Sequence, residues 1–442
     1  MTVSLIELND RSIGLHGTDK GLIQSPGFAN TAGKKPIFGE EAKQAARLHP
    51  RETYNQFWSQ LSLDPLVNTS SHFRHQADLA FAHLNELTDN TSLEDHVVLA
   101  VPSNYDRNQL SILLGMIKSC NFNATGIVDM PLLKTAHVNN PQQTVYLDIQ
   151  LHQSVVTTFS ANDKNIQREK VVQIPGTGLV ALHDAWANMI TDEFIKQCRF
   201  DPQHNAETEQ YIFNQLEKWL GQSLADNEVL MEINHKGNVY QARINRGNFE
   251  HRVKNIFARI QGEIQLLLGN QYSVCLPNDQ HLLPGLSSYL TNISAVEDSL
   301  LLENCITHLP LIAGESDSLN FVTKLPQTQS SVASVNTHGP QSSEATSPTH
   351  ILIDHQAYTL PTNSLVLGHV NGKVPDGAVI KPLDIQGGLV ISKINDSYIA
   401  EPSASSPVYV NGIEYRDDIT LNLGDVLGFS AKDTTFRLIR VE

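Results

Sequence analysis

Two short patterns in this 442-residue sequence combine residue types that could hold a metal ion or an anion. His72 and His75 are separated by three positions in a stretch of helical character, and Asp78 follows three positions later. Residues spaced by three share a helix face, and imidazoles and carboxylates are both zinc ligands. Two histidines that simply face solvent explain the same pattern, and this is the interpretation we favour.

The second pattern is Gly176-Thr177-Gly178, which precedes a predicted helix. The N–H groups at a helix N-terminus attract anions. A glycine turn that only lets the chain enter the helix is the simpler alternative. No GxxxxGK[S/T], GxSxG or HExxH motif occurs, so the corresponding enzyme classes lack support. The four cysteines are far apart and form no CxxC pair, and we expect core thiols.

Composition excludes several classes of partner. The chain has 31 basic and 47 acidic side chains and a net charge of −16, which would repel nucleic acid and anionic lipid over most of its surface. The first twelve residues lack the pattern of a secretory signal, and no apolar run approaches the ~20 residues of a spanning helix. We expect a cytoplasmic protein without membrane insertion or a nucleic-acid partner.

Candidate elements alternate between strand and helix patterns in the first part of the chain. Short strands with tight turns open it, and a second half of similar design follows. The expected strands are residues 3–8, 12–17, 21–24, 96–101, 144–149 and 154–159, and the expected helices are residues 39–48, 78–87 and 107–120.

Residues 315–349 are rich in Ser, Thr, Gln and Pro and poor in large apolar residues, which predicts a flexible linker. Residues 350–442 contain repeated short strand patterns separated by turn residues, which are typical of a β-sandwich. The expected strands are residues 351–353, 365–367, 389–394, 398–400, 408–410, 419–421, 426–429 and 436–441. We therefore predict a domain at residues 1–314, the linker, and a second domain at residues 350–442.

The first domain resembles the nucleotide-binding domain of DnaK-type heat-shock chaperones, within the actin, sugar-kinase and chaperone superfamily. The resemblance spans about residues 3–310 and implies a duplicated ribonuclease-H-like α/β ATPase fold. It rests on four stretches: SPGFA at 25–29, IFGEEAK at 37–43, VVLAVPSNY at 97–105 and INRGNFE at 244–250.

The positions that contact phosphate and metal in that family hold different residues here. Residues 7–11, ELNDR, stand where the family has Asp-Leu-Gly-Thr-Thr. Glu7 still offers a carboxylate for a cation, but Asp10 would face a polyanion and repel it. Residues 148–153, DIQLHQ, replace Asp-Leu-Gly-Gly-Gly-Thr, so that Asp148 is retained and three glycines are lost.

Other family positions are altered as well. Residues 277–279, PND, replace the Gly-Gly-Ser turn that receives adenosine, and Pro277 lacks an N–H. Trp58 falls near the family's catalytic lysine, and Met130 falls on its glutamate. Gly176 and Gly178 occupy the place of a Gly-Gly turn. If nucleotide binding is retained, the resemblance implies contacts from Glu7, Asp10, Asp148, Gly176 and Gly178, which form the list of candidate cofactor-binding residues.

The second domain resembles a forkhead-associated (FHA) domain in its VYVNG and LNLGDVLGF stretches at residues 408–412 and 421–429. Phosphothreonine recognition in that family uses an arginine, a serine, a histidine and an asparagine in the binding loops. Here the matching loops lack these residues. The residues that remain for contact with a partner are His369, Lys381, Ser406 and Asn411.

Both domains thus resemble scaffolds whose ligand chemistry is lost. The leading hypothesis is a non-catalytic pseudo-ATPase that acts as a scaffold or adaptor, binds protein partners through both domains, and needs no cofactor. One alternative is a weakly active regulatory ATPase that holds Mg-ATP with Glu7 and Asp148. Another is a signalling adaptor that binds phosphopeptides.

Overall fold

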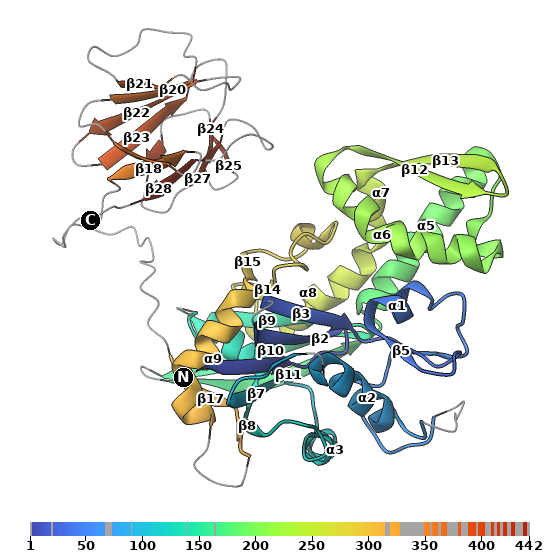
Figure 1. Ribbon diagram of the computed structural model, residues 1–442. Helices are drawn as coiled ribbons and strands as arrows, with labels where there is room; N and C mark the ends of the chain where they lie inside the picture. The colour runs from blue at the N-terminus through green and yellow to red at the C-terminus, as the bar shows by residue number, and fades with distance from the viewer. Residues whose placement is uncertain are drawn as a thin grey trace. The chain divides into compact units, whose positions relative to one another are not determined.

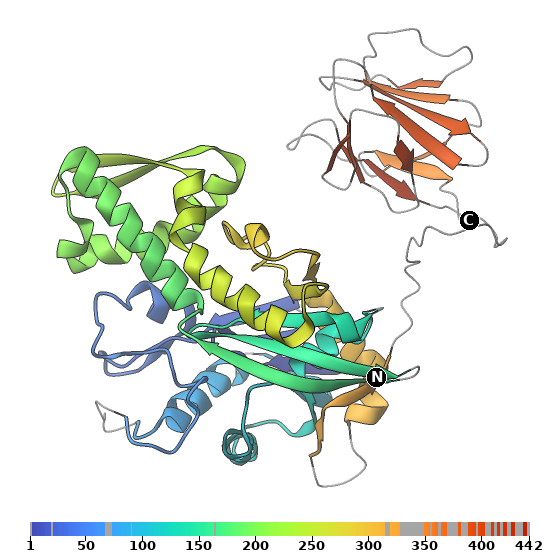
Figure 2. The same ribbon diagram turned by 180° about the vertical axis from the view of Figure 1, so that it is seen from behind.

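The computed structural model describes most of the N-terminal part of the chain and the strands of the C-terminal part. The described residues are 2–18, 21–66, 73–89, 91–138, 140–162, 165–313, 319–327, 349–353, 356–360, 364–368, 379–381, 388–394, 397–402, 408–410, 413–415, 419–421, 426–428 and 436–439. The chain divides into two compact units, Met1–Ala333 and Ser334–Glu442. The first is mixed α/β, and the described residues of the second form sheets (Figures 1 and 2).

A six-stranded sheet with the order β16-β8-β7-β1-β2-β3 forms one half of the first unit. β1 (Val3–Glu7), β2 (Ser12–Thr18) and β3 (Gly21–Pro26) are an antiparallel meander. β7 (His96–Val101) pairs in parallel with β1, and β8 (Ala124–Asp129) with β7. The strands predicted at residues 3–8, 12–17, 21–24 and 96–101 are confirmed.

A second sheet has the order β15-β14-β9-β10-β11-β17, in which the strands from β15 to β11 repeat the arrangement of β8-β7-β1-β2-β3. β9 (Thr144–Ile149), β10 (Gln153–Asn162) and β11 (Asn165–Pro175) form its meander. β14 (Ser273–Pro277) pairs in parallel with β9, and β15 (Ile293–Val296) with β14. The second half of similar design that the sequence predicts is therefore present as a repeated strand order.

The central strands are buried on both faces, because alternate side chains of a strand point to opposite sides. On β1, Val3 and Leu5 belong to the core between the two sheets, whereas Ile6 belongs to the core on the outer side. Two helices share the inner core with both sheets, and two others cover the outer face of the first sheet. The inner helices are α4 (Met130–Thr135) and α9 (Asp298–Ile312), and the outer ones are α2 (Gln76–Asp89) and α3 (Arg107–Ile117).

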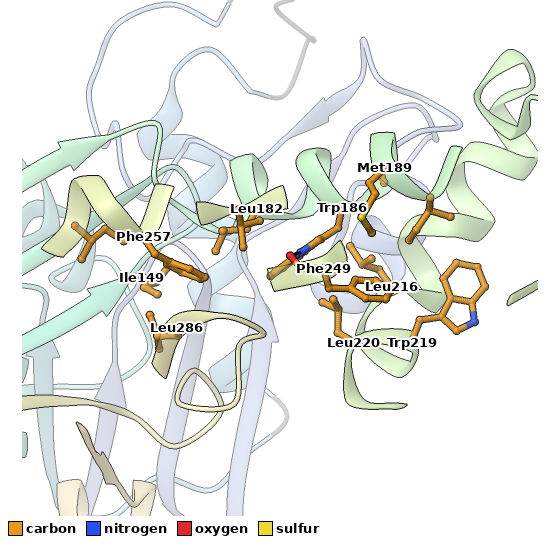
Figure 3. Packing of buried hydrophobic residues seen from close by; sticks show 14 of the residues in the cluster. Ile149, Leu182, Trp186, Met189, Leu216, Trp219, Leu220, Phe249, Phe257 and Leu286 are labelled. Atoms are coloured by element: carbon orange, nitrogen blue, oxygen red, sulfur yellow. Dashed lines mark hydrogen bonds between the residues drawn. The ribbon is translucent and has the colours of Figure 1, made fainter. Parts of the chain in front are cut away.

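The third core lies beyond the second sheet, among four helices and a β-hairpin. Trp186 and Phe249 are at its centre, where the Trp186 Nε1–H donates to the Phe249 carbonyl oxygen at 2.9 Å (Figure 3). The elements are α5 (Leu179–Cys198), α6 (Ala206–Ala225), β12 (Glu228–His235), β13 (Asn238–Asn245), α7 (Arg246–Arg252) and α8 (Lys254–Leu268).

Smaller elements complete the unit. α1 (Gly39–Gln44) is shorter than the helix predicted at residues 39–48, because the Arg47 N–H is taken by the Gln210 side chain instead of a helix carbonyl. The remaining elements are β4 (Ala29–Asn30), β5 (Ile37–Phe38), β6 (Thr53–Tyr54), and the 3-10 turns Pro141–Gln143, Pro202–His204 and Leu286–Ser288.

The predicted linker begins too early. β16 (Phe321–Val322) pairs with β8 of the first sheet, and β17 (Lys324–Pro326) pairs with β11 of the second. The segment 319–327 therefore joins the edges of both sheets and belongs to the first unit. The sequence did not reveal this because FVTKLP is a short apolar stretch next to a long polar one.

In the second unit, two sheets share one hydrophobic core. The sheets have the orders β19-β18-β28-β27-β24-β25 and β21-β20-β22-β23-β26, and both contribute side chains to that core. All eight strands predicted here are confirmed, and three short ones, β19, β21 and β25, were not predicted. The strands are β18 (His350–Ile353), β19 (Gln356–Thr359), β20 (Ser364–Gly368), β21 (Val379–Lys381), β22 (Gly388–Ile394), β23 (Ser397–Pro402), β24 (Val408–Val410), β25 (Ile413–Tyr415), β26 (Ile419–Leu421), β27 (Val426–Gly428) and β28 (Phe436–Ile439).

Candidate functional site

Three turns meet in the first unit, each at the end of a central strand. One joins β1 to β2, the second joins β9 to β10, and the third follows β14. Side chains of the first turn bond to both of the others, so the candidate residues of the two halves do lie together. In each of these contacts, both partners are groups of the protein itself.

The first turn is shaped by Asn9. Its Oδ1 accepts from the Arg11 N–H at 3.0 Å, which closes a local turn around Asp10. Gly27 packs behind this turn, where its N–H donates to the Arg11 carbonyl oxygen at 3.0 Å. A Cβ on Gly27 would overlap the Asp10 carbonyl oxygen, so this close approach requires glycine.

Asp10 inserts its carboxylate into the second turn. The Leu151 N–H donates to Asp10 Oδ1 at 2.7 Å, and the Asp10 side chain is almost wholly buried. Burial raises the pKa of Asp10 to about 7, although the backbone N–H groups of Leu151 and His152 favour the charged form. An acidic side chain of the chain itself therefore occupies the place where backbone amides converge.

Asp148 is held by two amides. The Nδ2 of Asn9 and the Nε2 of Gln150 donate to its Oδ2, at 2.8 and 3.0 Å. Gln150 also donates to Asn104 Oδ1 at 3.1 Å. Burial raises the pKa of Asp148, while Arg11 acts in the opposite direction. The Gln150 side chain of this turn thus bonds to the Asp148 carboxylate, together with Asn9 of the first turn.

Glu7 does not face open space. Its Oε1 accepts from the Lys134 ammonium at 2.7 Å, and its Oε2 lies 3.1 Å from the His16 Nε2. Glu7 is 6% exposed and Lys134 is 1% exposed. Burial alone would raise the pKa of Glu7, but the charge of Lys134 and the His16 hydrogen bond hold it well below its usual value. Lys134 went unnoticed in the sequence because it lies within the apolar stretch MPLLKTA.

Gly176 and Gly178 lead into α5 without leaving its N-terminus open. The N–H groups of Leu179 and Val180 donate to the carbonyl oxygens of Gln150 and Leu151, both at 2.9 Å. A Cβ on Gly178 would overlap the backbone of the second turn. The helix-entry interpretation therefore describes the geometry, since the first amides of α5 already have partners.

The third turn is tied to the other two. Arg11 forms an ion pair with Asp279. Gln280 brackets the end of β9, where it accepts from the Ile149 N–H at 3.0 Å and donates to the Ile149 carbonyl oxygen at 2.9 Å. The Gln280 side chain thus bonds to both the N–H and the carbonyl oxygen of one strand residue, as the backbone of a neighbouring strand would.

A cavity of about 780 Å³ lies beside these turns. Arg11, His152 and Asp279 of the three turns line it, and residues of α1, α5 and α6 line it as well. Two further ion pairs belong to the lining, in which Lys43 pairs with Glu217 at 2.7 Å and Arg47 pairs with Asp184 at 2.6 Å.

Two residues aligned with catalytic positions are part of cores. Trp58 is 1% exposed, and its Nε1–H donates to His83 Nδ1 at 3.1 Å. Met130 is fully buried at the first turn of α4. Beside it, Asp129 accepts from the Arg168 guanidinium at 2.8 Å and from the Ser103 hydroxyl at 2.7 Å. This ion pair joins β8 of the first sheet to β11 of the second, and no sequence pattern predicted it.

Of the His72, His75 and Asp78 pattern, only Asp78 lies in a described helix. His75 precedes α2, and Asp78 accepts from the backbone N–H groups of Arg74 and His75 at the start of that helix. His72 lies outside the described residues. Within the described ranges, no group of three or more His, Cys, Asp or Glu side chains is arranged to hold a metal ion.

The side chains of the four candidate contact residues of the second unit lie outside the described part of the structure. His369, Ser406 and Asn411 lie outside the described residues, and Lys381 is described only through its backbone in β21. All four cysteines are free, Cys275 and Cys305 being buried and Cys120 and Cys198 partly so.

No protein-family model matches the chain, and no curated protein matches it. None of the helices in the described part of the chain is both long enough and apolar enough to cross a membrane.

Proposed function

We propose that this protein is a nucleotide-independent scaffold, a pseudo-ATPase of the actin and chaperone type that binds protein partners through its two units. The observation that carries the proposal is the Asp10 carboxylate on the Leu151 N–H. If the second turn corresponds to a phosphate-binding loop, the chain supplies its own anion where a phosphate would bind. A bound phosphate would have to displace that carboxylate and would be repelled by it.

The Glu7 and Lys134 ion pair supports the same proposal from the cationic side. If Glu7 corresponds to a metal-binding carboxylate, the Lys134 ammonium at 2.7 Å supplies the positive charge that a divalent ion would provide. A buried ammonium beside the carboxylate repels a second cation and takes up its lone pairs. Asp10 thus supplies a negative charge in place of a phosphate, and Lys134 supplies a positive charge in place of a metal ion.

One observation favours the alternative of a cation-binding, weakly active ATPase. Asp10 Oδ2 and Asp148 Oδ1 are buried and have no hydrogen-bond partner in the described part of the chain. Buried polar atoms of this kind are rare, and an ion or water would satisfy them. Titration of the protein with Mg²⁺ alone tests this alternative, and heat that is lost in Asp148→Asn would support it.

Thermal unfolding with and without Mg-ATP, Mg-ADP or Mg-triphosphate at millimolar concentration tests the nucleotide-independent part. A ligand at a hundred times its Kd stabilises a protein by about 2.7 kcal/mol, so even weak binding would raise Tm. We expect no shift. A rise in Tm with Mg-ATP that Mg²⁺ alone does not produce would contradict the proposal.

The scaffold part is tested by purification of the full chain from its native cells after mild cross-linking. We expect a discrete partner in near-stoichiometric amount, retained after ATP is depleted and after Mg-ATP is added. Release of the partner by Mg-ATP would argue for a regulatory ATPase, and the absence of any stoichiometric partner would argue against a scaffold.

A further inference from the structure

The cavity next to the three turns is large enough for a ligand, although the turns themselves are filled. Its volume of about 780 Å³ lies within the range of about 300–1,000 Å³ that small-molecule sites occupy. It lies between segments of the two halves that are far apart in the sequence, with Phe28 and Arg47 on one side and Val180 and Leu220 on the other.

The charges that line this cavity cancel in pairs. Arg11 pairs with Asp279, Lys43 with Glu217 and Arg47 with Asp184, and all six side chains line the cavity. An anion would have to compete with three carboxylates for the three cations, and a cation would meet the reverse situation.

The two histidines of the lining add no charge at neutral pH. Burial lowers the pKa of His183 to about 4 and also lowers the pKa of His152. A neutral imidazole can both donate and accept a hydrogen bond.

Apolar side chains make up much of the wall. Leu179 and Val180 of α5, Leu220 and Leu224 of α6, and Leu282 and Leu283 after the third turn all line it. The Arg47 guanidinium lies 3.9 Å from the centre of the Phe213 ring and leaves part of that ring to the cavity. The lining therefore combines these apolar side chains with polar ones whose charges are paired, which favours a ligand that is partly apolar and carries no net charge.

From these features we infer that the cavity binds an uncharged, partly apolar small molecule that carries no phosphate. The ligand lies against α5 and α6. Because the ligand contacts both halves of the first unit, its binding allows a small molecule to regulate the scaffold. The inference goes beyond the proposed function and does not depend on partner binding.

Two positions allow the cavity to be filled by substitution. Gly221 lies within α6 and lines the cavity, and a Cβ added there meets no atom within 4 Å. Val180 faces the same space from the first turn of α5. Gly115 of α3 is also a helical glycine with open space at its Cβ, but it does not line the cavity, so it provides a matched control.

The test uses Nile red, an uncharged dye whose fluorescence rises in apolar sites, titrated into the full chain. We expect saturable binding at one site, weakened at least ten-fold in Gly221→Trp and in Val180→Trp and unchanged in Gly115→Trp. Sodium triphosphate at millimolar concentration should not displace the dye. Circular dichroism of each variant shows whether it is folded.

Three outcomes would overturn the inference. Absence of saturable dye binding would show that the cavity accepts no such ligand. Unchanged binding in both folded filling variants would place the dye elsewhere, and displacement by triphosphate would mean that the cavity prefers polyanions. The last outcome would also contradict the proposed function, whereas the first two would leave it intact.

Discussion

Asp10 is the residue whose position bears most directly on the proposed loss of phosphate binding. Its carboxylate is buried, bonded to the Leu151 N–H, and close enough to Asp148 for that charge to raise its pKa further. A turn built this way already uses the Leu151 N–H, and the ionised Asp10 carboxylate repels a second anion. The same arrangement makes Asp10 sensitive to pH near neutrality.

We predict that Asp10→Asn changes the pH dependence of stability. The folded-state pKa of about 7 exceeds the unfolded value of 3.8, so the folded protein retains this proton as pH rises. The favourable contribution of the protonated group is full below the unfolded pKa and is lost as pH rises through 7. The Asp10→Asn variant has no such loss. Its free energy of unfolding minus that of wild type should therefore rise by up to about 4 kcal/mol between pH 4 and 7.

Urea unfolding at several pH values measures this difference. The free energy of unfolding of Asp10→Asn minus that of wild type should rise from pH 4 to 7 and level off above pH 8. Asp64→Asn, which removes an exposed carboxylate, serves as the control. A difference that stays constant over the whole range would show that Asp10 does not titrate in this window.

Lys134 gives the second prediction at the scale of residues. Lys134→Met leaves the Glu7 carboxylate buried without its cation, and we expect a loss of about 3–5 kcal/mol in unfolding free energy. Glu7→Gln combined with Lys134→Met removes both charges and should recover part of that loss. A double variant no more stable than Lys134→Met alone would show that the two groups are not coupled.

At the scale of elements, His83 shows how a buried imidazole holds α2 in place. Its Nδ1 accepts from the Trp58 Nε1–H, its Nε2 lies 2.8 Å from the Ser25 hydroxyl, and its ring stacks on Phe38. Because Nδ1 is an acceptor, the proton of the neutral ring is on Nε2. Burial lowers the pKa of His83 to about 3.

The sign of its pH effect is opposite to that of Asp10. The unfolded chain takes up a proton below pH 6.5, whereas the folded chain resists it down to about 3, so stability is lost as pH falls across this window. Loss of unfolding free energy between pH 6.5 and 4 should be smaller in His83→Leu than in wild type, although this variant is less stable at pH 7 because it lacks the two hydrogen bonds. Equal slopes in calorimetric or urea unfolding would contradict this account.

The contact of the segment after α1 with α5 and α6 is the second element-scale feature. Arg47 pairs with Asp184 and lies over Phe213, and its N–H donates to the Gln210 side chain. We predict that Arg47→Ala increases hydrogen exchange in residues 39–48 and costs only about 1 kcal/mol in global stability, because the ion pair is partly exposed. Lys35→Ala, an exposed position before α1, is the control. Unchanged exchange in residues 39–48 would show that Arg47 does not hold this segment.

These elements also show what the sequence could and could not predict. The strands of both meanders were predictable because their side chains are apolar in continuous or alternating runs between turn residues. The length of α1 and the pairing of β16 and β17 were not, since distant partners decide both. Gln210, β8 and β11 lie far from these segments in the sequence.

At the scale of the whole molecule, the repeat of one strand order brings the ends of β1, β9 and β14 together. The resemblance of the sequence to a chaperone nucleotide-binding domain indicated the residues of this meeting point, Glu7, Asp10 and Asp148. It did not indicate their partners. Three polar residues lie in stretches whose patterns indicate core or loop, and only the fold shows what they contact. They are Lys134, Gln280 and Arg168.

The central claim is that the chain's own side chains occupy the positions of nucleotide and metal. A calorimetric titration of the full chain with Mg-ATP at pH 7.5 tests it most directly, with Mg²⁺ alone as the reference titration. The account predicts no binding heat up to millimolar nucleotide. Saturable heat at micromolar Mg-ATP, with a stoichiometry of one, would show that Asp10 and Lys134 leave the site open and would contradict the claim.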